Sequence, residues 1–162
     1  MTIKLRPVDD ADIREFAAWR YDSPYDVYDI TMDPDEAVGY FLGTDIHCHA
    51  LIERDEVVAY CTFGHDAQVP GGDYNVDALD IGLGVKPSRT GSGAGHRYIA
   101  AAIALATEAL EPRQLRVTIA AGNKRALRVW SNAGFTETSR FSTPREMMGS
   151  AEFVILVRDA GG

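Results

Sequence analysis

The segment KPSRTGSGAGH at residues 86–96 is rich in glycine and lies directly between an apolar stretch and an alanine-rich stretch. The apolar stretch predicts a strand at 78–85, and the alanine-rich stretch predicts a helix at about 94–110. A glycine-rich turn that opens into a helix directs backbone N–H groups outward, and the helix dipole adds about half a positive charge. The segment therefore predicts a binding site for an anion such as a phosphate group.

Three common motifs do not fit this segment. A Walker A loop ends in Gly-Lys-Ser/Thr, but Gly95 is followed by His96. The dinucleotide-binding pattern GxGxxG lacks its last glycine, because the two positions where it could stand hold His96 and Tyr98. A hydrolase elbow, GxSxG, around Ser92 would need a glycine in place of Thr90. The pattern that remains is TxxGxG at 90–95.

Charge is distributed unevenly along the 162 residues, whose net charge is −8. Residues 1–85 contain 18 acidic and 5 basic side chains, whereas residues 86–128 contain 8 basic and only 2 acidic ones. A basic segment inside an acidic protein favours a local anion site, although ordinary solvated surface charge is the alternative. The acidic first half argues against a nucleic-acid partner, because that affinity comes mainly from neutralising phosphates.

The composition is that of an ordinary globular protein, with 46% apolar and 25% charged residues. No apolar run reaches the ~18–20 residues that a membrane span needs, and the beginning, MTIKLRPVDD, is polar too early for a signal peptide. We therefore expect one domain over 1–162, in the cytoplasm, without a membrane partner. No metal site is expected: neither cysteine has a CxxC partner, and His47 and His49 are a weaker candidate pair than a solvated strand face.

Periodicity and capping residues predict the other elements. Asp9 is a candidate N-cap for a helix at about 10–20, Asp33 precedes a helix to residue 43, and Asn123 caps a helix that ends before Gly134. Further strands are expected at 3–6, 47–53, 56–65, 115–121, 135–141 and 153–157. If residues 54 and 55 form the turn of the first hairpin, three pairs share its apolar face: Ile52 with Val57, Ala50 with Ala59, and Cys48 with Cys61.

Two motifs in this order resemble the GNAT superfamily of N-acetyltransferases. The stretch PSRTGSGAG at 87–95 is similar to its pyrophosphate-binding loop, Arg/Gln-x-x-Gly-x-Gly/Ala, with Thr90 at the first position. The stretch NKRALRVWSNAGF at 123–135 is similar to its Asn-x-x-Ala-x-x-x-Tyr…Gly-Phe segment. The opening LRP at 5–7 is also similar to the usual first strand. The resemblance covers nearly the whole chain.

The resemblance implies an α+β fold with a mixed, mostly antiparallel central sheet of about six to seven strands, flanked by about four helices. Strands four and five would splay apart, and acetyl-CoA, the acyl donor, would enter the gap. The glycines inside the fourth strand would then allow the pantetheine to approach as an added strand. The cofactor-binding positions that the resemblance implies are Leu83, Gly84, Val85, Thr90, Gly91, Ser92, Gly93, Ala94, Gly95, His96, Asn123, Ala126 and Trp130.

The family's usual proton-donating tyrosine is replaced here by Trp130, whose indole cannot supply a proton near neutral pH. A tyrosine from the acceptor side, Tyr25 or Tyr28, could take its place. Otherwise the unaided thiolate would leave more slowly, or the chain would bind acyl-CoA without catalysing transfer. These three alternatives stay open at the level of sequence.

Direct attack of a neutral amine on the thioester is the chemistry that the resemblance implies. A lysine-type amine is about one part in a thousand neutral at pH 7, so it needs a base. Asp80 is the first candidate, followed by Asp77 and Glu53, and a salt-bridged carboxylate is the alternative interpretation of Asp80. A backbone N–H near Gly84 or Val85 would bind the developing oxyanion.

The acceptor would be a small-molecule amine or a peptide N-terminus. Family members bind it largely through the first two helices and their connection, here YDSPYDVYDI at 21–30. The three tyrosines and the three aspartates Asp22, Asp26 and Asp29 in this segment suit a positively charged, partly flat amine. Because dimers are common among similar proteins, a homodimer is a further expectation.

Overall fold

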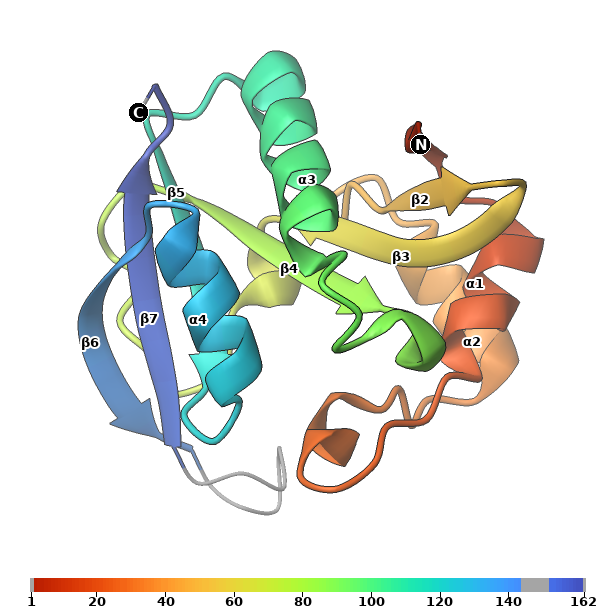
Figure 1. Cartoon of the computed structure of the whole chain (residues 1–162), viewed down its shortest axis with the longest axis horizontal. Helices are drawn as coiled ribbons and strands as arrows, with labels where there is room; N and C mark the ends of the chain where they lie inside the picture. The colour runs from red at the N-terminus through yellow and green to blue at the C-terminus, as the bar shows by residue number, and fades with distance from the viewer. Residues whose placement is uncertain (1, 144–151, 162) are drawn as a thin grey trace.

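The computed structural model describes residues 2–143 and 152–161. Seven strands form one sheet in the order β1-β2-β3-β4-β5-β7-β6 (Figure 1). Every pair is antiparallel except β4 with β5, which is parallel. The strands are β1 Lys4–Pro7, β2 His49–Glu53, β3 Glu56–Phe63, β4 Leu79–Val85, β5 Gln114–Ala120, β6 Thr136–Ser142 and β7 Glu152–Asp159.

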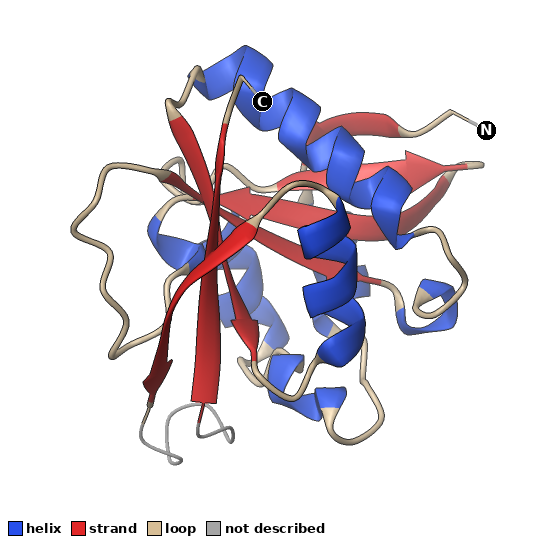
Figure 2. Ribbon diagram, turned by 60° about the vertical axis from the view of Figure 1, so that its left-hand side comes forward, coloured by secondary structure: helices blue, strands red, loops and turns tan. Residues whose placement is uncertain are grey.

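Helices lie on both sides of the twisted sheet (Figure 2). They are α1 Asp10–Ala17, α2 Pro34–Phe41, α3 Gly95–Leu110 and α4 Lys124–Asn132, with short 3₁₀ turns η1 Tyr25–Tyr28, η2 His65–Ala67 and η3 Pro87–Arg89. Residues of α3 and α4 pack into the main core with β3, β4, β5 and β7, whereas α1 and α2 form a second core with Tyr60. The expected α+β fold, with a mixed sheet and four helices, is confirmed. None of the described helices has the length and apolarity that crossing a membrane requires.

The predicted helix caps are confirmed, although α1 and α2 end at Ala17 and Phe41, before the expected residues 20 and 43. Asp9 and Asp12 form a reciprocal capping box at α1, with distances of 2.9 and 3.0 Å between side-chain oxygen and backbone nitrogen. Asn123 caps α4 by accepting from the backbone N–H of Ala126 at 3.1 Å. Gly134 follows α4 with a φ of +96°, the left-handed conformation in which glycine is favoured.

The predicted turn of the first hairpin is confirmed, but its register is only partly correct. Arg54 and Asp55 have φ values of 53° and 63°, as a tight hairpin turn requires. Ile52 pairs with Val57 as expected, but a bulge between Leu51 and Ile52 shifts by one residue all the pairs that lie farther from the turn. The pairing of Ala50 with Ala59 and of Cys48 with Cys61 is therefore wrong: the observed pairs are Leu51 with Ala59, Ala50 with Tyr60, and His49 with Cys61.

The same shift sets the position of Tyr60. Its ring stacks on Phe16 of α1 at a centroid distance of 3.9 Å and contacts Phe41 of α2 edge-on at 5.9 Å. These contacts fix Tyr60 on the face of the sheet that α1 and α2 cover, beside β4.

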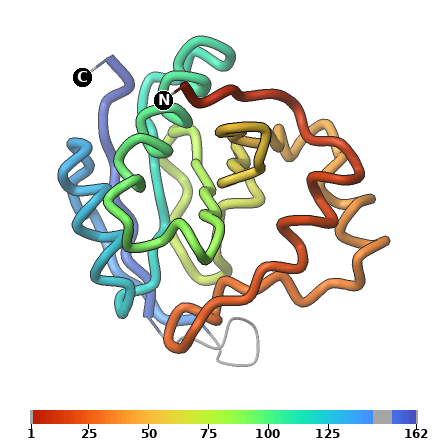
Figure 3. The backbone as a smooth tube through the Cα atoms, turned by 45° about the vertical axis from the view of Figure 1, so that its right-hand side comes forward, coloured from red at the N-terminus to blue at the C-terminus, as the bar shows by residue number. Residues whose placement is uncertain are grey.

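The two central strands separate soon after they meet. The pairing of β4 with β5 consists of Leu79 with Leu115 and Asp80 with Arg116, whereas β3 remains paired with β4 as far as Val85. The expected splay of the fourth and fifth strands is thus confirmed. Figure 3 shows most of the first 45 residues on one side of the molecule, the C-terminal strands on the other, and the green 80–95 segment between them.

Candidate active site

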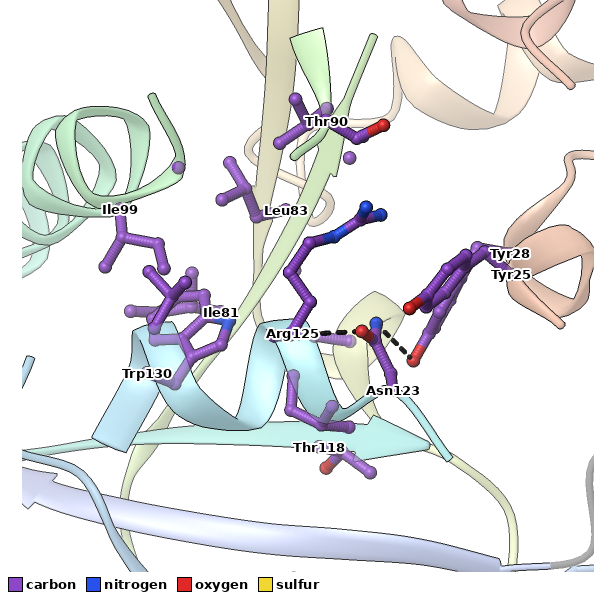
Figure 4. Close-up of a pocket in the computed structure, with 18 of the residues that line it drawn as sticks. Tyr25, Tyr28, Ile81, Leu83, Thr90, Ile99, Thr118, Asn123, Arg125 and Trp130 are labelled. Atoms are coloured by element: carbon purple, nitrogen blue, oxygen red, sulfur yellow. Dashed lines mark hydrogen bonds between the residues drawn. The ribbon is translucent and has the colours of Figure 1, made fainter. Parts of the chain in front are cut away.

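A cleft of about 720 Å³ opens where β4 and β5 separate, within the usual range for a small-molecule site. Its walls come from β3, β4, η2, the segment at 89–99, β5, α4 and the tyrosine segment, residues 21–30. Figure 4 shows Trp130 near Ile81 and Ile99 on one side of the cleft, and Tyr25 with Tyr28 on the other.

One edge of β4 faces this cleft without a strand partner. Asp80 in β4 and Lys86 just after it both bond toward the β3 side. The Asp80 carbonyl accepts from Gly64 N and Lys86 N donates to the Val58 carbonyl, both at 2.9 Å. Bonding alternates along an antiparallel ladder, so Gly84 also bonds toward β3, and its neighbours Leu83 and Val85 direct their N–H and C=O groups into the gap.

The glycines of β4 make room for side chains of β3. A Cβ on Gly84 would lie 2.9 Å from the hydroxyl oxygen of Tyr60 and closer still to its ring, and a Cβ on Gly82 would lie 2.5 Å from the hydroxyl of Thr62. These overlaps explain both glycines within the protein itself, without the ligand approach that the sequence suggested. They also place the Tyr60 ring beside the open edge of β4.

The glycine-rich loop presents a row of free backbone donors. Gly91 and Gly93 have φ values of +72° and +83°, which only glycine adopts readily. Among the described residues, no carbonyl or side chain accepts from the backbone N–H groups of residues 91–96. The hydroxyls of Thr90 and Ser92 bond instead to carbonyls of the turn, at 2.7 and 2.6 Å. The geometry therefore fits an anion bound by backbone donors.

Three arginines line the cleft beside this loop: Arg89, Arg125 and Arg128. Glu56 accepts hydrogen bonds from Lys86 and from Arg89, the latter at 3.0 Å, so part of this positive charge is neutralised. Arg125 lies 4.5 Å from the centre of the Tyr25 ring and close to the loop at Gly91 (Figure 4). It therefore links the loop to the tyrosine segment.

Asn123, at the N-cap of α4, and Trp130, within α4, both line the same cleft. The amide oxygen of Asn123 caps the helix, and its amide nitrogen donates to the hydroxyl of Tyr28 at 3.3 Å. Trp130 is 4% exposed and packs edge-on against Phe135 at a centroid distance of 5.1 Å. Trp130 is thus a wall of the cleft, whereas Asn123 fixes a neighbouring tyrosine.

Two tyrosine hydroxyls are held at opposite strands of the gap. Tyr28 accepts from the backbone N–H of Ala120 at 3.0 Å and from Asn123, while Tyr21 donates to the carbonyl of Val85 at 2.7 Å. Burial is the main cause that raises the pKa of Tyr28, and the two hydrogen bonds offset part of that effect. Burial also raises the pKa of Tyr21, to about 12. Both phenols are therefore protonated at neutral pH.

The three carboxylates considered as bases do not line the cleft. Asp80 is 2% exposed, and its two oxygens accept from Arg116 at 2.7 and 2.8 Å and from Gln68 at 2.9 Å. Glu53 is buried in an ion pair with Arg97, and Asp77 is exposed on the loop before β4. The salt-bridged interpretation of Asp80 is the one that the geometry favours.

The structure thus brings together most of the predicted positions and adds others. Of the predicted cofactor-binding positions, Ser92 and Ala94 do not line the cleft. Nor do the three aspartates of the tyrosine segment, Asp22, Asp26 and Asp29. Lining residues that sequence reasoning missed include Tyr60, Thr62, Asp66 and Thr118. The unusual glycines of β4 were a clue to Tyr60 and Thr62, but only the observed register identifies the pairs.

Comparisons with solved structures show the same fold. A spermidine N-acetyltransferase chimera from Vibrio cholerae and hSSAT has a TM-score of 0.79 at 13% identity, covering 98% of this chain and 96% of that chain. The Salmonella typhimurium protein yncA, described as an acetyltransferase and solved with its cofactor acetyl-CoA, has a TM-score of 0.70 at 17% identity, covering 98% and 94%. Ribosomal-protein-alanine N-acetyltransferase from Brucella melitensis has a TM-score of 0.73 at 17% identity, covering 96% and 99%.

Sequence comparison identifies the family. No curated protein sequence matches the chain closely enough to provide a named relative. A family model described as an acetyltransferase (GNAT) domain, however, matches residues 2–136, which include the glycine-rich loop and the whole of α4. The chain therefore belongs to the GNAT acetyltransferase family.

Proposed function

We propose that the protein is an N-acetyltransferase that uses acetyl-CoA to acylate a primary amine. The observation that carries this proposal is the row of free N–H groups at 91–96, in the same cleft as the unpaired edge of β4. A diphosphate needs the first feature, and an extended amide chain, such as pantetheine, needs the second. A bound acetyl-CoA molecule would supply a thioester acyl group.

On the donor side, the backbone does most of the binding. The N–H groups of residues 91–96 and the nearby side chains of Arg125 and Arg128 would hold the diphosphate. Leu83 and Val85 have the N–H groups that face the gap, and these are the donors available to a carbonyl oxygen there. Gly84, which the sequence also suggested for this role, bonds toward β3.

Tyr28 is the phenol that we propose to protonate the leaving thiol, in place of the family tyrosine that Trp130 replaces. Its oxygen accepts two N–H bonds, so its own proton is left to donate into the cleft. General acid catalysis is typically worth about 10²–10⁴-fold, so Tyr28→Phe is expected to lower kcat roughly 100-fold.

The matched control is Tyr25→Phe, which keeps the ring over Arg125 and removes only a hydroxyl. It is expected to leave kcat within about twofold of the wild type, and neither change should alter the Kd for CoA, measured by calorimetry. Equal kcat values for the two variants would show that Tyr28 is not the proton donor.

The second candidate is a non-catalytic acyl-CoA-binding protein, which Trp130 favours because it removes the usual proton donor. Both candidates predict that acetyl-CoA raises the melting temperature. Only the enzyme predicts release of free thiol that depends on added amine. The test is therefore a thiol-release assay over amino acids, polyamines, aminoglycosides and peptides. CoA binding without amine-dependent release would establish the second candidate, and absence of both would refute the proposal.

A further inference from the structure

Asp66 is the single Asp or Glu among the described residues that line the cleft. It lies in η2, directly after β3, and is half-buried. Since the carboxylates of the tyrosine segment lie outside the cleft, Asp66 is the negative charge that a bound acceptor would meet there.

Two hydroxyl donors hold the Asp66 carboxylate. One oxygen accepts from Thr62 at 2.7 Å, and the other accepts from Tyr40 of α2. Thr62 is 1% exposed, so this partner is fixed in the core. A carboxylate has about four lone-pair positions, so two remain for a ligand. The group is held in place and can still bind a cation.

The position of Asp66 relative to β4 links it to the donor side. The Thr62 hydroxyl, which donates a hydrogen bond to Asp66, lies against Gly82. Ala67, the residue after Asp66, is also close: its Cβ lies 3.4 Å from the position that a Cβ on Gly82 would take. Gly82 immediately precedes Leu83, whose N–H faces the gap. Leu83 packs with α3, whereas Thr62 and Asp66 lie on the opposite face of the sheet. A ligand at Asp66 would therefore approach the gap from the face opposite α3.

Much of the cleft wall is uncharged, either aromatic or aliphatic. Tyr21, Tyr60, Val69 and Phe153 line it. Burial is the main cause that raises the pKa of Tyr60, and the nearby charge of Asp66 adds to the effect, so this phenol stays neutral. The other charged side chains that line the cleft within the described part of the chain are the three arginines on the donor side, which would repel a second positive charge.

Building on the proposed function, we infer that Asp66 binds the ammonium group of the acceptor, and that the acceptor class is a primary monoamine whose single positive charge is attached to an apolar or aromatic body. A polyamine would bring further charges that no second carboxylate among the described lining residues neutralises. An amino acid would bring a carboxylate close to Asp66.

Two matched pairs of amines test the class. 2-Phenylethylamine differs from phenylalanine by the absence of a carboxylate, and butylamine lacks the additional amino groups of spermidine. We expect kcat/KM to be at least 10-fold higher for the first member of each pair, measured by thiol release at saturating acetyl-CoA. A preference for phenylalanine or spermidine would overturn the inference, as would turnover of neither monoamine by a protein that binds CoA.

Asp66→Asn tests the residue. Loss of a charged hydrogen bond is expected to lower kcat/KM for the preferred monoamine roughly 10-fold or more, mainly through KM. The melting temperature and the Kd for CoA should stay close to those of the wild type. Asp26→Asn, an exposed change in the tyrosine segment, is the matched control and should leave kcat/KM unchanged.

The outcomes separate this inference from the proposed function. Equal kcat/KM for Asp66→Asn and wild type would overturn the role of Asp66 while leaving the acetyltransferase activity intact. A variant that loses CoA binding and melts early would show that Asp66 is structural, which also overturns the inference. Failure of the wild type to bind CoA would refute the proposed function itself.

Discussion

The two halves of the cleft are built from different parts of the chain. The donor half consists mainly of backbone: N–H groups of a short glycine-rich loop and one edge of β4. The acceptor half consists of side chains from distant segments, including Tyr21 before η1, Tyr60 on β3 and Asp66 on η2. A site formed by backbone groups tolerates changes of side chain as long as φ and ψ are kept. In a site formed by side chains, a substitution alters the groups that contact the ligand. Under the proposed function, acceptor specificity can therefore vary while donor binding is retained.

The ion pair between Asp80 and Arg116 supports the acceptor half, and its loss should have the largest effect on stability. Arg116 also donates to the carbonyl of Val76 at 2.8 Å and lies 4.9 Å from the Tyr74 ring, so the pair fixes the loop that follows η2. Removing one partner leaves a buried charge, so Asp80→Ala should lower the free energy of unfolding by about 3–5 kcal/mol, measured by urea denaturation.

Asp77→Ala is the matched control for Asp80, because Asp77 is exposed on the same loop. It should change the free energy of unfolding by no more than about 0.5 kcal/mol. A finding that Asp80→Asn folds as stably as the wild type and yet loses about 100-fold in kcat would restore Asp80 as the base.

The donor half can be perturbed through backbone conformation alone. Gly93 and Gly122 both have open space where a Cβ would stand, but only Gly93 has a positive φ, +83°. Gly93→Ala should therefore cost about 1–2 kcal/mol more than Gly122→Ala. The cost appears as lower stability if the loop keeps its shape, and as up to ~10-fold weaker CoA binding if the loop relaxes. Calorimetry and urea denaturation together measure both parts, and identical values for the two variants would contradict the loop geometry.

The smallest predicted effect concerns pH and the support behind the donor half. Hydrogen bonding from Arg97, at the start of α3, is the main cause that lowers the pKa of Glu53 below its ordinary value of 4.5, although burial opposes it. A lowered folded pKa means that the stabilisation is complete above pH 4.5 and is lost as the pH falls through the folded value.

Glu53→Gln should accordingly be less stable than the wild type at pH 7, and the difference in melting temperature should shrink below pH 4. Glu137→Gln is the comparison, because Glu137 is an exposed carboxylate paired with Arg140 at the other end of the sheet, and it should show a much smaller difference. A Glu53→Gln difference that grows on acidification would reverse the assigned sign.

The features that local sequence predicts are those whose partners are near in the chain. The caps Asp9 and Asn123 bond three residues away, and the glycine-rich loop is continuous. The hydrogen bond of Tyr28 with Ala120 spans 92 residues and the pair of Asp80 with Arg116 spans 36, so neither follows from periodicity. The bulge near Ile52 also depends on how two strands fit together. Because the sequence did not predict it, the expected pairing was off by one residue, and Cys61 lies opposite His49 instead of Cys48.

The early separation of β4 from β5 has a consequence for the protein before any ligand binds. An unpaired strand edge normally invites a strand from another molecule, and proteins protect such edges with turns, charges or covering segments. Here the edge lies in the middle of the sheet, and the hydroxyl of Tyr21 already occupies the Val85 carbonyl. An intruding strand would have to displace that hydroxyl, so we expect this one tyrosine to oppose aggregation of the ligand-free protein through its own cleft.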